Sequence, residues 1–304
     1  MYPGALKQRL GMLSDDTEHA CMTAQALLEA RGCVATFERV LAWKLRWWLL
    51  ALPPAIGGGT LRALVRLWFV GPKKSGVMSA GNGAVMRAPI IGAWLDDPDR
   101  IPAFVAASTR ITHRDPRAMT GALAIAIAAH HAARDDELAP ERVMAEIRRR
   151  IAEDDELSRA LERVAQALRD GTAPIELAEQ LGLKNGVTGY VHHTVPMCLQ
   201  VWLRSPRDVR RAIEEVVQLG GDSDTTAAIV GALAGAAAGA AGIPEDWLGI
   251  VDYPRSLSWI RQLGARLEAR GEPLALCWPA VPARNVVFLV IALAIGLRRL
   301  LPPY

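Results

Sequence analysis

The stretch GGDSDTT, residues 220–226, leads directly into residues 227–243, an uncharged run composed mostly of alanine and glycine. Two glycines free the backbone for a sharp turn, and carboxylates and hydroxyls then crowd the start of a predicted helix. Hard divalent cations prefer oxygen ligands of this kind. Asp and Ser are also common helix caps, and acidic side chains interact favourably with the dipole at a helix N-terminus. The stretch taken alone is consistent with a metal site and with a helix cap.

A second acidic cluster, Ser14-Asp15-Asp16, precedes another helical pattern near the other end of the chain. Apolar residues recur with helical spacing from Cys21 to Leu28, and Ser14 is suited to an N-cap position. If the two clusters meet, their four carboxylates repel each other unless cations lie among them. Two divalent ions about 3.5–4 Å apart would satisfy such a site and activate a water molecule. Two independent helix caps, which need no metal, remain the alternative.

A third polar cluster, Gly81-Asn82-Gly83, ends a glycine-rich loop at residues 71–83. Loops of this length inside compact domains are commonly functional. His113 lies in a short polar segment between two helical patterns, where an isolated histidine is more often structural. We interpret the pair His192-His193 as structural as well.

Helical patterns account for almost the whole chain, and the alternation typical of strands is absent almost everywhere. Residues 227–243 are predicted to form a buried core helix, and a tail helix is predicted from about residue 286. Trp43, Trp47 and Trp48 fit the core, although an exposed face of that helix would serve a partner. We predict an all-α chain of one domain without internal repeats. The other predicted helices lie between Ser14 and Gly32 and over residues 37–52, 60–69, 84–95, 103–111, 117–134, 140–153, 155–169, 174–181, 192–203, 206–219, 244–248 and 256–270.

The composition is that of a globular protein, with 51% hydrophobic and 22% charged residues among 304. A net charge of +3, with basic residues dispersed among acidic ones, gives no indication of nucleic-acid binding. The four cysteines show no CxxC pair and no metal-type spacing with histidine, so we expect a reducing, cytoplasmic environment. They are Cys21, Cys33, Cys198 and Cys277.

Residues 286–297 are strongly apolar but number about a dozen, fewer than the roughly 20 that a membrane span needs. Arg298 and Arg299 end this run. We therefore expect no membrane partner, and we expect the chain to act as a monomer.

Four segments in this order resemble the ADP-ribosylglycohydrolase family. Each segment is a weak signal by itself, but four in the same order are specific. The resemblance covers about residues 14–242 and leaves helices over residues 244–304 outside the motifs. The segments are SDDTE at residues 14–18, SAGNGAVMR at 79–87, TH at 112–113 and GGDSDTTA at 220–227.

The resemblance implies a compact orthogonal bundle of helices, a single domain over residues 1–304, with two Mg²⁺ or Mn²⁺ ions at its centre. The two acidic clusters would each supply half of the metal shell, and Asp15 and Asp16 would be catalytic. We expect Asp16 and Asp224 to lie nearest the reacting centre. The residues assigned to the metal shell are Ser14, Asp15, Asp16, Asp222, Asp224 and Thr225.

The implied activity is hydrolysis of the glycosidic bond that joins ADP-ribose to a protein or a small molecule. The reaction would pass through an oxocarbenium-like state, and the metal ions would supply charge stabilisation and a nucleophilic water. The loop glycines, Gly81 and Gly83, would let backbone N–H groups approach a phosphate. Asn82 would add a side-chain contact, and His113 matches a family histidine near the ligand.

The sequence departs from the family pattern at its start. Family members usually begin with a glycine-rich helix followed by a glutamate, and residues 1–13 contain neither. Glu18 follows the Asp pair at a helix position of the motif, so we do not assign it as a general base. The departure leaves a second hypothesis open, an ADP-ribose-binding or regulatory relative without catalysis. A helical scaffold whose acidic clusters are only caps is the third.

Overall fold

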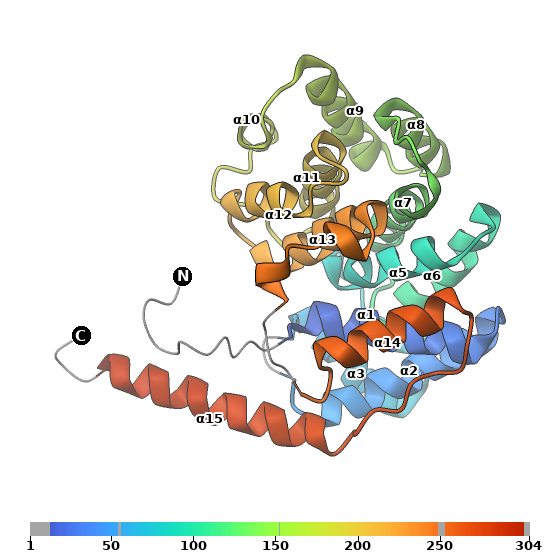
Figure 1. The fold of residues 1–304 in the computed structure, drawn as a ribbon, viewed down its shortest axis with the longest axis vertical. Coiled ribbons are helices and arrows are strands. Elements are labelled where there is room, and N and C mark those ends of the chain that lie inside the picture. Colours follow the sequence, from blue (N-terminus) through green and yellow to red (C-terminus); the bar gives the residue numbers. More distant parts are fainter. Residues whose placement is uncertain (1–12, 54–55, 152, 249–252, 301–304) are drawn as a thin grey trace.

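The computed structural model describes residues 13–53, 56–151, 153–248 and 253–300, and these ranges form fifteen α-helices without a strand (Figure 1). The all-α prediction is therefore confirmed. The first seven helices are α1 (Asp15–Ala30), α2 (Val34–Leu50), α3 (Gly58–Val70), α4 (Pro72–Ser75), α5 (Ala88–Trp94), α6 (Ile101–Thr112) and α7 (Pro116–Arg134). The next eight are α8 (Pro140–Arg150), α9 (Asp155–Asp170), α10 (Pro174–Gln180), α11 (Val191–Arg204), α12 (Val209–Gln218), α13 (Ser223–Ala238), α14 (Leu257–Glu268) and α15 (Ala280–Leu300). Short 3₁₀ helices are η1 (Asn82–Arg87), η2 (Pro98–Arg100), η3 (Ala240–Gly242) and η4 (Glu245–Trp247).

Helix α7 lies at the centre of the molecule and contacts α5, α6, α8, α11 and α13. Its alanine-rich sequence allows close approach from several sides, and residues 121–129 are all buried. Gly92 of α5 packs directly on its backbone, since a Cβ there would lie 1.8 Å from the Ala126 carbonyl oxygen. In Figure 1, α8–α12 lie on one side of α5, α7 and α13, and α1–α3 with α14 lie on the other.

Helix α13 confirms the predicted core helix, although it ends at Ala238. Ile229, Val230, Leu233 and Ala234 are buried in the main hydrophobic cluster, which runs from α1 to α13. Small residues elsewhere on this helix let α11 and α12 pack closely against it. The helix therefore holds the GGDSDTT stretch at a fixed place in the core.

Several elements differ from the prediction. The segment predicted as one helix over residues 84–95 is the 3₁₀ helix η1 up to Arg87 followed by α5, and the helix predicted over residues 244–248 is the 3₁₀ helix η4. The glycine-rich loop at residues 71–83 contains the short helix α4, because Pro72 is suited to the first turn of a helix. The tail helix begins at Ala280 rather than near residue 286, since Pro282 lies within its first turn, where proline is tolerated. With 21 residues, α15 is the one helix among the described residues that is long and apolar enough to cross a membrane. The sequence predicted a tail helix too short to span a membrane, whereas the 21 residues of α15 reach the roughly 20 that a span needs.

The tryptophans of α2 have different environments. Trp48 is buried and donates its indole N–H to Glu18 at 2.7 Å, as expected for a core residue. Trp43 is 53% exposed, so the prediction that it belongs to the core is wrong. Neighbouring helix positions differ because only one face of α2 packs against α1 and α6.

Candidate active site

The N-termini of α1 and α13 meet, although more than 200 residues separate them in the sequence. Thr225 forms a side-chain hydrogen bond with Asp16, which joins the two acidic clusters. Asp224 lies close enough to Asp15 and Asp16 to raise the pKa of each. The structure therefore brings the two predicted halves of the site together.

The N-cap residues of the two clusters do not cap their own helices. Ser14 and Asp222 occupy the N-cap positions of α1 and α13, but neither side chain accepts a cap hydrogen bond. Ser14 instead donates its hydroxyl to Asp16 Oδ2 at 2.9 Å. Asp115 and Asp154 do cap α7 and α9 with their side chains, as Asp ordinarily does. The side chains at the two N-cap positions are therefore directed to partners other than their own helices.

Asn82 orients Asp222 from the glycine-rich segment. Its Nδ2 donates to Asp222 Oδ2 at 2.7 Å and to Thr194 Oγ1 at 3.1 Å. Both amide hydrogens are used within the protein, so the side chain positions a carboxylate. Only the Asn82 Oδ1 remains for contact with a ligand.

Three isolated β-bridges fix the loops around the site. They pair Val77 with His113, Gly81 with Tyr190, and Val187 with Gly221. Gly221 has a φ of +79°, and a Cβ there would lie 2.2 Å from the Val187 carbonyl oxygen. Only glycine permits this approach. The segment at residues 187–190 thus links the glycine-rich loop to the GGDSDTT stretch.

A cavity of about 250 Å³ lies where these segments meet. Asp15, Asp222 and Asp224 line it, whereas Ser14 and the buried Asp16 are not among its lining residues. Glycine backbone forms much of the remaining wall. The other lining residues are Gly57, Gly58, Gly59, Thr60, Ser79, Gly81, Asn82, Gly83, Met86, His113, Gly189 and Thr225.

His113 is buried in this wall with its Nε2 directed at the loop glycines. A Cβ at Gly81 would lie 3.4 Å from Nε2, and one at Gly83 would lie 3.0 Å from Cε1 of the same ring. Burial and the nearby Arg87 guanidinium lower the pKa of His113 to about 3, so the imidazole is neutral. Glycine at these positions leaves room for the ring beside the cavity.

His113 lies at the end of a buried hydrogen-bonded chain. Arg87, fully buried, donates Nη2 to Thr112 Oγ1 at 2.8 Å, and this oxygen lies 2.9 Å from His113 Nδ1. The Thr112 hydroxyl keeps one hydrogen to donate and a second lone pair to accept with, so the hydrogen bond to Nδ1 forms in either tautomer. In the tautomer in which Thr112 donates to Nδ1, the ring proton resides on Nε2 and is directed at the loop glycines.

The surroundings of the carboxylates disfavour their ionised form. Burial, Asp16 and Asp224 together raise the pKa of Asp15 to about 7. Burial also raises the pKa of Asp16 and Asp222. In addition, Asp16 Oδ1 is a buried atom without a hydrogen-bond partner. These observations fit a group of oxygens that bind cations.

The donor set is not made of acidic side chains alone. Within the described ranges, no three His, Cys, Asp or Glu side chains form a group that could hold a metal ion. Cation binding here requires oxygens of other kinds, and the hydroxyls of Ser14 and Thr225 lie next to the carboxylates.

Sequence reasoning missed the triple glycine at residues 57–59, together with Thr60, Ser79 and Gly189. The triple glycine is visible in the sequence directly before the helix predicted over residues 60–69. Its role depends on packing, since a Cβ at Gly59 would lie 2.8 Å from Ser79 Oγ.

Two other polar groups lie outside this cavity. His192 is buried and lies 3.0 Å from Asp154 in a network separate from the cavity, as the structural interpretation predicted. Glu18 is buried with Trp48, Arg255 and Arg284, so it is not a free base. The departure from the family pattern at residues 1–12 lies outside the described residues.

The sequence profile of the ADP-ribosylglycohydrolase family matches residues 2–274. The chain belongs to this family. Among its relatives, the ADP-ribosyl-[dinitrogen reductase] glycohydrolase of Rhodospirillum rubrum is 28% identical over 273 residues, covering 88% of this chain and 83% of the relative. An uncharacterized protein of Archaeoglobus fulgidus is 32% identical, covering 78% and 75%. The human ADP-ribosylhydrolase ARH3 is 25% identical, covering 57% and 54%.

A solved structure agrees with the family assignment. A chain described as an ADP-ribosylglycohydrolase-related protein complex superposes with a TM-score of 0.66 and 26% identity, covering 88% of both chains. The fold is thus the all-α ADP-ribosylglycohydrolase fold.

Proposed function

We propose that this protein hydrolyses the glycosidic bond between ADP-ribose and an acceptor, either a protein side chain or a small molecule. The observation that carries the proposal is the convergence of the α1 and α13 acidic clusters, whose N-cap residues do not cap their helices, on one cavity. The names of the family and of its relatives support the class of substrate.

We assign Ser14, Asp15, Asp16, Asp222, Asp224 and Thr225 to hold two Mg²⁺ or Mn²⁺ ions. When bound, such ions supply stabilisation of developing charge and a nucleophilic water at neutral pH. The raised pKa of Asp15 and the unpartnered Asp16 Oδ1 support the assignment.

The protein itself would bind and orient the substrate. Backbone at the glycines around the cavity approaches a phosphate without side chains in the way. In the tautomer with the proton on Nε2, the neutral His113 donates this hydrogen to an oxygen of the ligand. Asn82 keeps Asp222 turned to the cavity through its 2.7 Å hydrogen bond.

The experiment measures release of ADP-ribose from an ADP-ribosylated protein by the full chain, with Mg²⁺, with Mn²⁺ and with a chelator. Asp224→Ala is compared with Asp136→Ala, which removes an exposed carboxylate outside the cavity. We expect Asp224→Ala to lower the rate about a hundredfold or more, the scale of a lost charge-stabilising group, and Asp136→Ala to leave it unchanged.

Each outcome bears on a separate part of the proposal. Equal rates for Asp224→Ala and the wild-type protein would contradict the assignment of the site. Full activity in the chelator would contradict the role of the cations. ADP-ribose that raises the melting temperature without any turnover would support the binding hypothesis instead of hydrolysis.

A further inference from the structure

Helix α15 is joined to the body of the protein only at its beginning. Val281 and Asn285 are buried, and Asn285 donates its side-chain amide to the Ala51 carbonyl at 2.7 Å. Arg284 donates to Glu18 at 2.8 Å. From Val286 onward the helix extends away from the other helices (Figure 1). Overall, only 12% of the apolar segment Ala280–Arg298 is buried.

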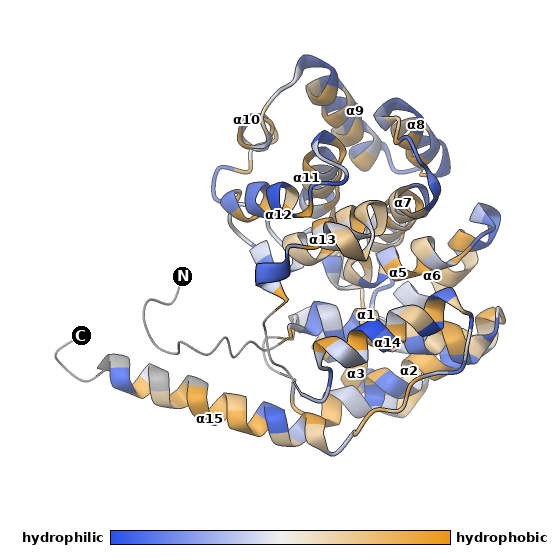
Figure 2. Ribbon diagram, in the orientation of Figure 1, coloured by the Kyte–Doolittle hydropathy of each residue, from blue (hydrophilic) through white to orange (hydrophobic). Residues whose placement is uncertain are grey.

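The free part of α15 is apolar around its whole circumference. Residues 286–297 contain no charged or polar side chain, and Figure 2 shows the helix as predominantly hydrophobic beyond its first turns. A helix of this kind has no polar face for water and is stable only when surrounded by apolar material. The exposed large side chains are Val286, Val287, Leu289, Val290, Ile291, Leu293 and Leu297.

A cluster of four tryptophans, Trp43, Trp47, Trp68 and Trp278, lies near the start of α15, since Trp278 precedes this helix by two residues. The ring of Trp47 lies 5.7 Å from Trp43, 6.0 Å from Trp68 and 5.5 Å from Trp278. Three of the four are more than one-third exposed, and Phe69 beside them is 84% exposed. The tryptophan side chain combines an apolar ring system with a polar N–H group, and it is typical of the membrane–water interface for this reason.

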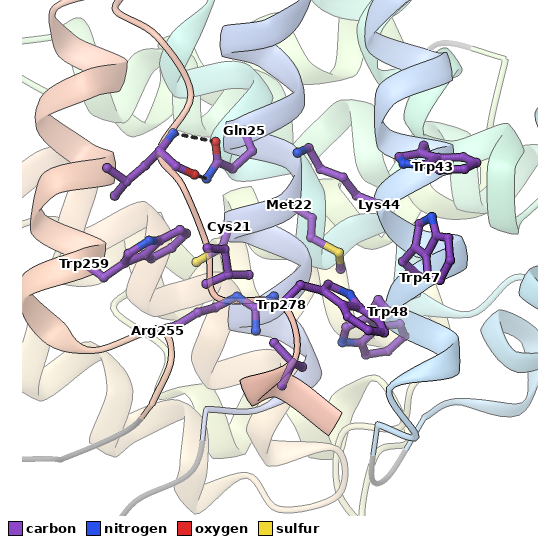
Figure 3. Close-up of a pocket in the computed structure, with 13 residues that line it drawn as sticks. Cys21, Met22, Gln25, Trp43, Lys44, Trp47, Trp48, Arg255, Trp259 and Trp278 are labelled. Atoms are coloured by element: carbon purple, nitrogen blue, oxygen red, sulfur yellow. Dashed lines mark hydrogen bonds between the residues drawn. The ribbon is translucent and has the colours of Figure 1, made fainter. Parts of the chain in front are cut away.

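The tryptophan cluster also borders a second cavity, of about 560 Å³ (Figure 3). Trp43, Trp47 and Trp278 line it, and so does Val281 from the first turn of α15. The apolar surface therefore continues from α15 across the cluster into a hollow in the body. Lys73 and Lys74 of α4, four and five residues after Phe69, are exposed and add positive charge near the end of α3.

We propose that α15 inserts into a lipid bilayer, with the tryptophan cluster at the interface. The free segment Val286–Leu297 is about 18 Å long, which exceeds the roughly 15 Å of one hydrocarbon leaflet. The lysines of α4 favour membranes that contain anionic lipids. Pairing with a second copy would cover only one side of α15 and leave its other apolar side chains exposed to water, because the helix has no polar face. This proposal does not depend on the proposed hydrolase activity.

The test is flotation of the full chain with vesicles of equal parts phosphatidylcholine and phosphatidylglycerol, and with phosphatidylcholine alone. The double variant Val287→Asp/Ile291→Asp places charges on side chains that are 59% and 50% exposed. The matched control, Ile175→Asp/Val217→Asp, changes aliphatic side chains that are 53% and 46% exposed on other helices. We expect the wild-type protein and the control to float, and the α15 variant to bind vesicles about tenfold less or weaker still.

Light scattering of the same proteins without lipid separates the alternatives. A wild-type protein that stays in the aqueous phase with both vesicles would overturn the proposal. A dimer that the α15 variant converts to a monomer, without vesicle binding, would overturn it in favour of helix pairing between copies. Equal flotation of the α15 variant and the control would show that the helix is not the inserted element.

Discussion

At the scale of single residues, the same side-chain type performs different tasks at equivalent positions. Asp115 and Asp154 cap their helices, whereas Asp222, also at an N-cap position, accepts from Asn82 on another segment. The difference arises from what lies opposite the helix end. The Asp222 carboxylate accepts from the Asn82 amide and lines the cavity, and it does not cap its own helix.

Replacement of Asn82 by Ala tests how Asp222 is held. The loss leaves a half-buried carboxylate without its amide donor, so we expect the free energy of unfolding to fall by about 1–3 kcal/mol in the presence of a chelator. Urea unfolding measures the change. Gln166→Ala is the control, because it removes an exposed amide–carboxylate hydrogen bond to Asp170. A control effect as large as that of Asn82→Ala would contradict a special role for Asn82.

His113 makes stability sensitive to acid. Its folded pKa of about 3 lies below the ordinary value near 6.5, because burial disfavours the imidazolium. The unfolded chain therefore binds more protons between these two values, and stability is lost as pH falls through that window. His113→Asn removes this contribution. The unfolding free energy that the variant loses relative to the wild-type protein should therefore be smaller at about pH 4.5 than at pH 7, by about 2–3 kcal/mol. Urea unfolding at both pH values measures it; an unchanged difference would contradict the neutral, buried state.

At the scale of elements, helix periodicity predicted most helices to within a few residues, and close helix crossings determined how they pack. α5 crosses α7 at Gly92, where the two backbones are almost in contact. Boundaries were missed where no periodicity exists, as in the four-residue α4, and where prolines lie inside a first turn, as in α15.

Two glycine-to-alanine substitutions should have opposite effects. Gly92→Ala places a methyl group against the Ala126 carbonyl, and we expect a loss of about 3 kcal/mol of unfolding free energy. Gly235→Ala in α13 meets no atom within 4 Å and should raise stability by about 0.5–1 kcal/mol, as alanine favours the helix. Thermal unfolding of both variants measures the signs. Destabilisation by Gly235→Ala as large as that by Gly92→Ala would contradict the packing argument.

At the scale of the whole molecule, one buried carboxylate connects the two ends of the described chain. Glu18 of α1 accepts hydrogen bonds from Trp48, Arg255 and Arg284. The two arginines lie 237 and 266 positions away in the sequence. This cluster secures the base of α15 and the segment before α14 to the core.

Glu18→Gln should therefore destabilise the protein by about 3–5 kcal/mol, because it leaves buried guanidinium charge without its carboxylate. Glu272→Ala, which breaks the exposed pair with Arg31, should cost less than about 1 kcal/mol. Urea unfolding compares the two, and limited proteolysis reports release of the C-terminal segment. Similar small losses for both variants would contradict the role of the cluster.

The sequence by itself determined the all-α class, the positions of most helices and the family, because periodicity and short motifs are local properties. It also identified the segments that line the cavity on three sides. Only the tertiary structure decided that Ser14 and Asp222 do not cap, that residues 187–190 join both motifs, and that Trp43 and α15 face outward. These outcomes depend on contacts between residues far apart in the chain. A local sequence pattern does not predict which distant residues will contact a given side chain.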